Sequence, residues 1–391
     1  MEHAILIKYA EIHLKGLNRP FFEKKLVTNI RHALGEIPGE IVREQGRVFV
    51  YAIPEASIEE AALRLTRVFG IHSLCITRCV EKDWETIVEN AGALMAPYAG
   101  GATFKVFARR ADKRFPMTSE EICRELGGRM LEMYPMLKVD VHTPQIPLTV
   151  EIRQDRCFVY TRDIPGCGGL PVGTSGRAML LISGGIDSPV AGYMIAKRGV
   201  ALSAIHFYSY PYTSERARDK VVELTRIVSS YAGPMDLYLV PFTEIQTTIY
   251  DKCPSSETTV LMRRLMMKIA QLTAEKCGCQ ALITGESIGQ VASQTIESLA
   301  VTNDAVSVPV FRPLIGFDKE EIIERAEKIG TFATSILPYE DCCTVFVPQH
   351  PVTKPKVDKL RESEALVDFA PMIERAMGQT EVLRISHNVS D

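Results

Sequence analysis

The sequence predicts two small α+β modules followed by an α/β domain with a parallel, doubly wound sheet. Strand and helix patterns are mixed over residues 1–57 and again over residues 58–163. A stretch rich in Gly and Pro follows at residues 164–176, and over residues 177–391 strand and helix patterns alternate regularly. Regular alternation implies parallel strands joined by right-handed crossovers, and the Gly- and Pro-rich stretch indicates a linker.

The composition narrows the class of protein. The chain has 391 residues, of which 46% are apolar, enough for the cores of two or three domains. Its net charge of −3 provides no global basic field, so any nucleic-acid surface must be local. No run of 18 apolar residues occurs, and the N-terminal residues mix charged and apolar types. We therefore expect neither a membrane span nor a signal peptide, and a cytoplasmic location.

The first module has a simple pattern. Residues 4–7 and 47–51 are typical of strands, and a helix is expected from Arg19 onward. Its basic residues are either a solvated face or an RNA contact, and charge alone does not decide between the two. These residues are Lys8, Lys15, Arg19, Lys24 and Lys25.

The second module contains the densest basic stretch of the chain. Helices are expected over residues 58–67 and 84–95, and strands over residues 73–80 and 103–108. With Phe107 and Phe115 nearby, a basic cluster after a strand suits phosphate binding and base stacking, whereas the alternative is a solvated loop. The candidate RNA-binding residues are Lys105, Arg109, Arg110, Lys113 and Arg114.

The α/β domain opens with an apolar strand, a tight turn and a helix. Gly184 and Gly185 are free to adopt positive φ and leave room for a ligand, so N–H groups can converge on an anion. We expect Ser188 to cap the helix at its positive end, where a phosphate would bind. Ser183 and Asp187 add a hydroxyl and a metal-binding carboxylate. The alternative, an ordinary βαβ turn, does not require them.

Residues at the carboxyl ends of the later strands are expected to line one crevice, because ligands of parallel sheets bind there. Leu181 and Phe207 are candidates to sandwich an adenine, and His206 to bond its edge. Gly285 would let the nucleotide lie against the backbone. Arg263, within an apolar helical ladder, is either an exposed charge or a phosphate ligand. Each residue alone suits an ordinary core or turn, and only their joint placement favours a nucleotide site.

Two features follow downstream. Asp318 and Glu321 have the spacing of a capping box, which places Lys319 in a first helical turn where the macrodipole disfavours a cation. A nearby anion would explain this lysine, and an exposed side chain is the alternative.

Cys342 and Cys343 are adjacent, which does not suit tetrahedral zinc. They are either a buried structural pair or a sulfur carrier in a nucleotide-binding domain.

Several stretches resemble known families. The loop at residues 183–188 lacks the Walker A ending and resembles the pyrophosphate loop of the PP-loop ATP pyrophosphatases. The basic stretch at residues 104–116 is similar to a THUMP domain, an RNA-binding module of tRNA-modifying enzymes. Over nearly its whole length the chain resembles the ThiI family of tRNA 4-thiouridine synthetases. The further blocks that carry this resemblance are Tyr9–Arg19, Gly285–Thr295, Arg312–Leu314 and Asp341–Cys343.

The ThiI resemblance implies a ferredoxin-like domain, a THUMP domain and a PP-loop domain, in the order of the three predicted parts. It implies ATP-dependent adenylation of uridine 8 of tRNA at its C4 oxygen and transfer of persulfide sulfur, with Mg²⁺ assisting and AMP and pyrophosphate leaving. Asp187 and Lys319 match residues tied to adenylation, and the sulfur-handling cysteine falls on Cys342 or Cys343. The residues matched to nucleotide binding are Leu181, Ile182, Ser183, Gly184, Gly185, Asp187, Ser188, His206, Phe207, Arg263, Gly285 and Gln294.

One departure from the family pattern bears on the sulfur source. Some members carry a C-terminal rhodanese domain with a second cysteine, whereas this chain ends at Asp391. We therefore expect a separate cysteine desulfurase to supply sulfur directly, and Cys342 and Cys343 to share sulfur transfer and disulfide formation. A homodimer is also expected. Family members with the extra domain also serve thiamine thiazole synthesis, and the resemblance leaves open whether this chain does so. Two alternatives stand beside this interpretation: a PP-loop enzyme that adenylates a small molecule, and a non-catalytic RNA-binding protein.

Overall fold

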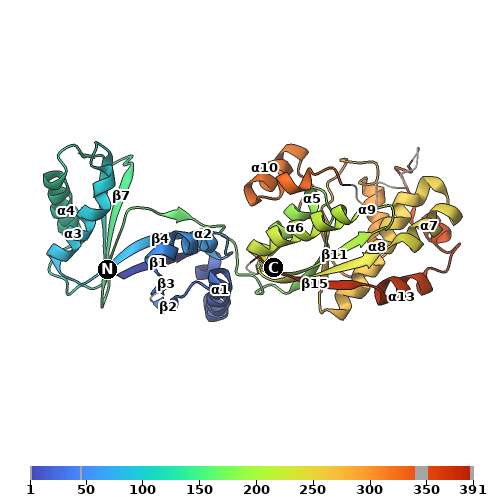
Figure 1. Cartoon of the computed structure of the whole chain (residues 1–391), viewed down its shortest axis with the longest axis horizontal. Coiled ribbons are helices and arrows are strands. Elements are labelled where there is room, and N and C mark those ends of the chain that lie inside the picture. The colour runs from blue at the N-terminus through green and yellow to red at the C-terminus, as the bar shows by residue number, and fades with distance from the viewer. Residues whose placement is uncertain (1, 45, 340–350, 388–391) are drawn as a thin grey trace. The chain divides into compact units, whose positions relative to one another are not determined.

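The computed structural model describes residues 2–44, 46–339 and 351–387. The chain divides into two compact units, Met1–Gly169 and Leu170–Asp391, each with its own sheet (Figure 1). The division between the units falls inside the Gly- and Pro-rich stretch at residues 164–176.

In the first unit one sheet runs through both α+β modules, in the order β2-β3-β1-β4-β8-β7-β5-β6 with β9 beside β4. The long strand β4 (Ile71–Val80) joins the modules because it pairs with β1 along its length and with β8 at its end. This continuity was not predicted, since pairing between distant strands leaves no local pattern. The other strands are β1 (Glu2–Tyr9), β2 (Glu40–Glu44), β3 (Arg47–Tyr51), β5 (Thr103–Arg110), β6 (Lys138–Val139), β7 (Ile146–Ile152), β8 (Cys157–Tyr160) and β9 (Ile164–Pro165).

The helices of this unit begin where the sequence predicted them, with one addition. The predicted ones are α1 (Arg19–Leu34), α2 (Ile58–Thr66) and α3 (Trp84–Met95). The addition, α4 (Ser119–Met133), starts with a capping box in which the Thr118 hydroxyl accepts the Glu121 N–H. Helix α4 packs on β5 and contributes to the core of the THUMP-like module.

The second unit has the parallel sheet that the alternating pattern predicted. Its order is β14-β13-β10-β11-β12-β15, and the neighbouring strands are parallel except for β15, which runs antiparallel to β12. The predicted fold class is therefore confirmed. The strands are β10 (Arg177–Leu181), β11 (Ala201–Tyr208), β12 (Met235–Pro241), β13 (Ala281–Ile283), β14 (Val310–Phe311) and β15 (Glu381–Ile385).

Helices cover both faces of this sheet (Figure 1). Right-handed crossovers place α5 (Asp187–Ala196) and α6 (Glu215–Ala232) on one face and α8 (Thr258–Lys276) on the other. Within the described ranges, no helix is both long and apolar enough to span a bilayer. The remaining helices are α7 (Thr243–Lys252), α9 (Ile296–Asn303), α10 (Lys319–Ile329), α11 (Phe332–Ser335), α12 (Val357–Glu364) and α13 (Ala370–Gly378).

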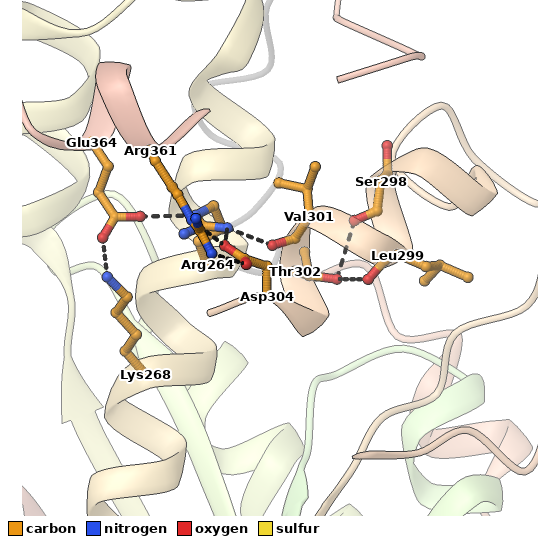
Figure 2. Close-up of polar contacts among 9 residues, drawn as sticks. All are labelled: Arg264, Lys268, Ser298, Leu299, Val301, Thr302, Asp304, Arg361 and Glu364. Atoms are coloured by element: carbon orange, nitrogen blue, oxygen red, sulfur yellow. Dashed lines mark hydrogen bonds and ion pairs between the residues drawn. The ribbon is translucent and has the colours of Figure 1, made fainter. Parts of the chain in front are cut away.

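Helix α8 carries a buried arginine that fastens α9 and α12 to the rest of the unit (Figure 2). Arg264 is 2% exposed. Its Nε donates to Glu364 at 2.8 Å, and its Nη1 donates to Asp304 at 3.1 Å and to the Val301 carbonyl at 2.6 Å. A guanidinium with this many partners holds three helices in one arrangement.

Two further cations complete this Arg264 cluster. Lys268 pairs with Glu364, and Arg361 pairs with Asp304 (Figure 2). Burial alone would raise the pKa of Glu364, but hydrogen bonds from Lys268 and Arg264 outweigh burial and leave this pKa lowered. Glu364 is therefore ionised at neutral pH, and the cluster is held by charge-assisted bonds.

Candidate functional site

The loop between β10 and α5 is closed by two serines. The expectation that Ser188 caps α5 is wrong, because α5 begins at Asp187 and Ile186 stands at the N-cap. The Ser188 hydroxyl instead accepts the N–H of Ser183 at 2.9 Å, and the two hydroxyl oxygens lie 3.2 Å apart. Because Ser188 sits in the first helical turn, this bond folds the loop back onto the positive end of α5.

Close packing explains the glycine that lies against this loop, Gly285. Neither Gly184 nor Gly185 uses the freedom of glycine to adopt a positive φ. A Cβ on Gly285 would lie 2.7 Å from the backbone nitrogen of Ser188 and 2.8 Å from the carbonyl carbon of Asp187. Only glycine allows the segment after β13 to approach the start of α5 this closely.

A cavity of about 330 Å³ opens at the carboxyl ends of β10, β11 and β13. The structure brings most of the sequence-predicted nucleotide residues together around it, whereas Gly184 and Gly185 are outside the lining. The predicted residues in the lining are Leu181, Ile182, Ser183, Asp187, Ser188, His206, Phe207, Arg263, Gly285 and Gln294. Glu286, which the sequence placed at the same strand end as Gly285, also lines the cavity, whereas Thr259, Met266, Met267, Thr284 and Thr302 are lining residues that sequence reasoning missed.

Strand β11 contributes a polar and an aromatic side chain to the cavity. His206 is 5% exposed, and its Nδ1 lies 3.0 Å from the carbonyl oxygen of Ile182. Nδ1 therefore carries a hydrogen, because a carbonyl oxygen only accepts. The ring of Phe207 packs edge-to-face on Phe242, with centroids 5.5 Å apart. His206 thus ties β10 to β11, and Phe207 is an apolar wall fixed by its neighbour.

A buried carboxylate organises the basic side of the cavity. Glu286 is 4% exposed and accepts hydrogen bonds from Arg263, from Arg312 Nε at 2.7 Å and from Thr284 Oγ1 at 2.8 Å. Arg263 Nη1 also donates to the Ser293 carbonyl at 2.6 Å. Arg263 is therefore neither an exposed charge nor a mobile one. In the sequence, Glu286 was indicated by its position directly after Gly285. No local pattern indicated that its side chain is buried.

Two polar atoms near this carboxylate lack a partner. Gln294 Oε1 and Arg312 Nη2 are buried, and no hydrogen-bond partner for either occurs in the described part of the chain. Burial also lowers the pKa of Arg312. Because unpaired buried polar atoms are costly, an open acceptor in the cavity wall at Gln294 indicates a place for a ligand donor.

Asp187 and Lys319 form an ion pair at the rim of the cavity. Asp187 Oδ1 lies 2.7 Å from Lys319 Nζ, and Asp187 Oδ2 accepts from Gln290 Nε2 at 2.9 Å. The capping box predicted for Asp318 and Glu321 is confirmed, since both of its hydrogen bonds are present. Asp187 is thus the anion that explains a lysine in the first turn of α10.

The basic stretch of the first unit divides into exposed and anchored side chains. Lys105 donates to the Val141 carbonyl, while Arg109 and Lys113 are exposed. Arg110 donates to two loop carbonyls, at 3.0 and 3.2 Å. Arg114 pairs with the Asp112 carboxylate at 2.9 Å, and this pairing holds the pKa of that carboxyl well below its usual range.

The two aromatic rings of the same stretch differ. Phe107 is 40% exposed beside Lys105, whereas Phe115 is only 7% exposed within the core. The expectation that Phe115 stacks on bases is therefore wrong, because packing against the module core removes its faces from solvent. Phe107 keeps the exposure that stacking requires.

Cys342 and Cys343 lie outside the described residues. The described chain on either side of them is anchored to residues that neighbour the cavity lining in the sequence. Ser335 Oγ donates to the carbonyl of Gly185 at 3.3 Å, and Thr295 Oγ1 donates to the carbonyl of Thr353 at 2.7 Å. Both anchors are thus next to residues of the pyrophosphate-like loop or of the cavity wall.

The charged residues of the site do not form a preorganised metal cage. Over the residues that the structure describes, no group of three or more His, Cys, Asp or Glu side chains is placed to hold a metal ion. Asp187 with the hydroxyls of Ser183 and Ser188 is a set of hard oxygen donors. This set suits Mg²⁺ bound together with substrate phosphates rather than in an all-protein site.

Three known domain families match successive parts of the chain. "Thiamine biosynthesis protein (ThiI)" matches residues 173–369, the ThiI ferredoxin-like domain matches residues 4–75, and the THUMP domain matches residues 81–162. A probable tRNA sulfurtransferase of Acetivibrio thermocellus is 52% identical and covers 99% of this chain and 100% of its own length. One of Lachnospira eligens is also 52% identical, covering 94% of this chain and 95% of its own length.

Solved structures agree with these sequence matches. A 4-thiouridine synthetase solved as an RNA complex with bound ATP is 37% identical, with a TM-score of 0.92 and coverage of 98% of this chain and 100% of that one. The protein PH1313 of Pyrococcus horikoshii is 29% identical, with a TM-score of 0.64 and coverage of 84% and 99%. Given full-length identity of this size and a matching fold, the chain belongs to the ThiI family.

Proposed function

We propose that this chain is an ATP-dependent tRNA sulfurtransferase that converts uridine 8 of tRNA to 4-thiouridine. The observation that carries the proposal is the cavity at the positive end of α5, where His206, Arg263 and Gln294 meet from separate elements. In support, a relative of the same fold was solved with both RNA and ATP. A nucleotide site joined to a THUMP module suits an enzyme that activates a base of RNA.

The first step would be adenylation of the base. The uridine C4 oxygen attacks the α-phosphorus of ATP, and pyrophosphate leaves. Ser183 and Ser188 at the start of α5 would bind phosphate oxygens, and Lys319 would offset charge that develops on the attacked phosphoryl group. Phe207 would contact the adenine, and Gln294 Oε1 would accept a hydrogen bond from its amino group. Mg²⁺ held by Asp187 would shield the charge of the leaving pyrophosphate.

The second step would transfer sulfur. A cysteine desulfurase would load a persulfide on Cys342 or Cys343, and its terminal sulfur would attack C4 and expel AMP. The other cysteine would then attack the sulfur that remains on the protein. This step breaks the persulfide S–S bond, leaves sulfur on the base as 4-thiouridine, and forms a disulfide that a thiol reductant reopens. The anchors of Ser335 and Thr353 beside the cavity support this assignment.

The first unit would hold the tRNA. Lys105, Arg109 and Lys113 would contact phosphates, and Phe107 would stack on an exposed base. Arg110 and Arg114, which bond within the loop, would position it and contribute charge. The structure therefore supports different roles for the basic residues that the sequence grouped together.

Other expectations remain predictions. They are the domain limits 1–57, 58–163 and 177–391 with a linker at 164–176, the desulfurase as sulfur donor, the cytoplasmic location, a homodimer, and a sulfur role in thiamine thiazole synthesis. Light scattering of the purified chain tests the homodimer directly.

The function is tested by incubating the chain with ATP, Mg²⁺, a desulfurase with cysteine, and unmodified tRNA, followed by nucleoside mass analysis. We expect 4-thiouridine at position 8 and release of AMP and pyrophosphate. A chain carrying Cys342→Ser and Cys343→Ser should still release pyrophosphate in the presence of tRNA but make no 4-thiouridine, while Cys167→Ser should behave like the parent. Normal thiolation by the double variant would exclude the sulfur mechanism.

Two results would favour the alternatives. Exchange of pyrophosphate into ATP that ignores tRNA and requires a small acceptor would indicate a small-molecule adenylating enzyme. Tight tRNA binding without any ATP turnover would indicate a non-catalytic RNA-binding protein.

A further inference from the structure

Cys277 and Cys279 form a second pair of thiols, remote from the nucleotide cavity. They follow the end of α8, and their Sγ atoms are 3.5 Å apart. Arg263, which lines the cavity, lies 14 residues earlier (277 − 263) on the same helix. At a rise of 1.5 Å per residue this is about 20 Å along the helix axis. The pair is thus too far from the cavity to serve the proposed sulfur transfer.

The two thiols differ in exposure and in proton affinity. Cys279 is 5% exposed, whereas Cys277 is half-buried and reaches solvent. The contact with Cys279 lowers the pKa of Cys277, helped by the Tyr238 hydroxyl and opposed by partial burial, and in its thiol form Cys277 also donates to the carbonyl of Ala274 at 3.4 Å. The contact between the two thiols raises the pKa of Cys279. Cys277 is therefore the better nucleophile of the two, and Cys279 keeps its proton.

We propose that Cys277 and Cys279 are a reversible dithiol–disulfide site that exchanges with small-molecule disulfides. The Cys277 thiolate attacks one sulfur of the disulfide, forms a mixed disulfide and releases one thiolate. Cys279 then loses its proton to solvent and attacks the Cys277 sulfur, which releases the second thiolate. The protein thiols lose two electrons and the small molecule gains them.

The local backbone suits this closure. Gly278 between the two cysteines has a φ of 73°, a left-handed conformation that glycine adopts at little cost. Forming an S–S bond of about 2.05 Å requires the sulfur atoms to approach by about 1.5 Å from their contact distance. Rotation of two side chains across one glycine turn is a small adjustment compared with moving an element of the sheet.

Other thiols of the chain provide matched controls. Cys123 and Cys253 are also half-buried, but burial raises the pKa of each. Exposure alone would make all three thiols react alike. If Cys277 is alkylated faster than Cys123 and Cys253, the difference in alkylation rate is therefore due to the contact between Cys277 and Cys279.

The test uses the full chain and oxidised glutathione as the probe at pH 7, with acid quenching, alkylation and peptide mass analysis. We expect an intramolecular 277–279 disulfide that dithiothreitol reverses. The Cys279→Ser variant should instead retain glutathione on Cys277, and Cys277→Ser should form neither product. Without glutathione, Cys277 of the parent should react with iodoacetamide about tenfold faster than Cys253. Equal alkylation rates, or glutathione retained on Cys277 of the parent without a disulfide, would overturn the proposal.

Discussion

Two neighbouring arginines of α8 serve opposite purposes. Arg263 lines the cavity and shares the Glu286 carboxylate with Arg312, in a cluster where an acceptor on Gln294 is left open. Arg264, the next residue, points about 100° around the helix and bonds within a cluster of paired charges (Figure 2). A ligand site has hydrogen-bonding atoms without a partner in the protein, whereas a structural cluster such as that of Arg264 bonds its polar atoms to one another.

This contrast makes a general point about buried charge. A buried ion pair adds little over an apolar contact of the same shape, but removing one partner is costly because the other charge remains buried. Changes in the Arg264 cluster should therefore appear as lost stability. Changes around Arg263 should appear mainly as lost binding of the nucleotide.

The largest effect is expected from Arg264→Met. It strips partners from two acidic residues, Asp304 and Glu364, and should lower the free energy of unfolding by about 4 kcal/mol. Urea titration of the parent and variant measures this loss. ATP affinity of the folded variant should stay within about twofold of the parent, since Arg264 faces away from the cavity. If the folded variant binds ATP much more weakly than the parent, Arg264 would also contribute to nucleotide binding, and the two arginines would not have separate roles.

The next effect is expected from Arg263→Gln. We predict that Arg263 contacts the nucleotide phosphates, so its replacement should weaken ATP binding by about 50-fold, the size of one charge-assisted hydrogen bond. Calorimetric titration with ATP measures the affinity, and urea titration should show a smaller loss of stability than for Arg264→Met. Unchanged ATP affinity would remove Arg263 from the site.

A third, intermediate effect is expected from Glu364→Gln and depends on pH. Arg264 keeps Asp304 as a partner, so at pH 7 the loss of stability should be about 2 kcal/mol. Since the pKa of Glu364 is lowered from its usual 4.5 in the folded chain, its ionised form stabilises the fold above that range. The benefit is lost as the pH falls below 4.5 and through the lowered pKa of the folded chain, so the difference between the variant and the parent should shrink as the pH falls through this range. A difference that persists unchanged at low pH would show that packing, not charge, is responsible.

The smallest effect is expected at an exposed pair. Arg384 of β15 donates to Asp236 of β12 at 2.7 Å, but the Arg384 side chain is 63% exposed. Replacement by alanine should change the unfolding free energy by less than about 0.5 kcal/mol, because solvent and salt screen such pairs. Urea titration at low and high salt checks this value. If this replacement lowered the unfolding free energy as much as Glu364→Gln does, burial would not be what makes an ion pair important for stability.

Much of the fold and part of the site could be predicted from local patterns. The alternation that began at residue 177 predicted a parallel sheet, and Asp318 with Glu321 predicted the start of α10. Ligands of such sheets bind at the carboxyl ends of the strands, so the sequence also indicated which loops would meet. These inferences succeed because helix caps, turns and apolar periodicity are properties of a few adjacent residues.

Tertiary structure alone decided what each side chain does. Phe115 is buried in a core that the sequence did not reveal, and the Ser188 hydroxyl accepts from Ser183 instead of capping α5. Arg263 and Arg264 are adjacent and chemically identical, yet one lines a cavity and the other anchors α12. The physical reason is that burial and hydrogen-bond partners come from segments far apart in the chain, and no local pattern encodes which of them will meet.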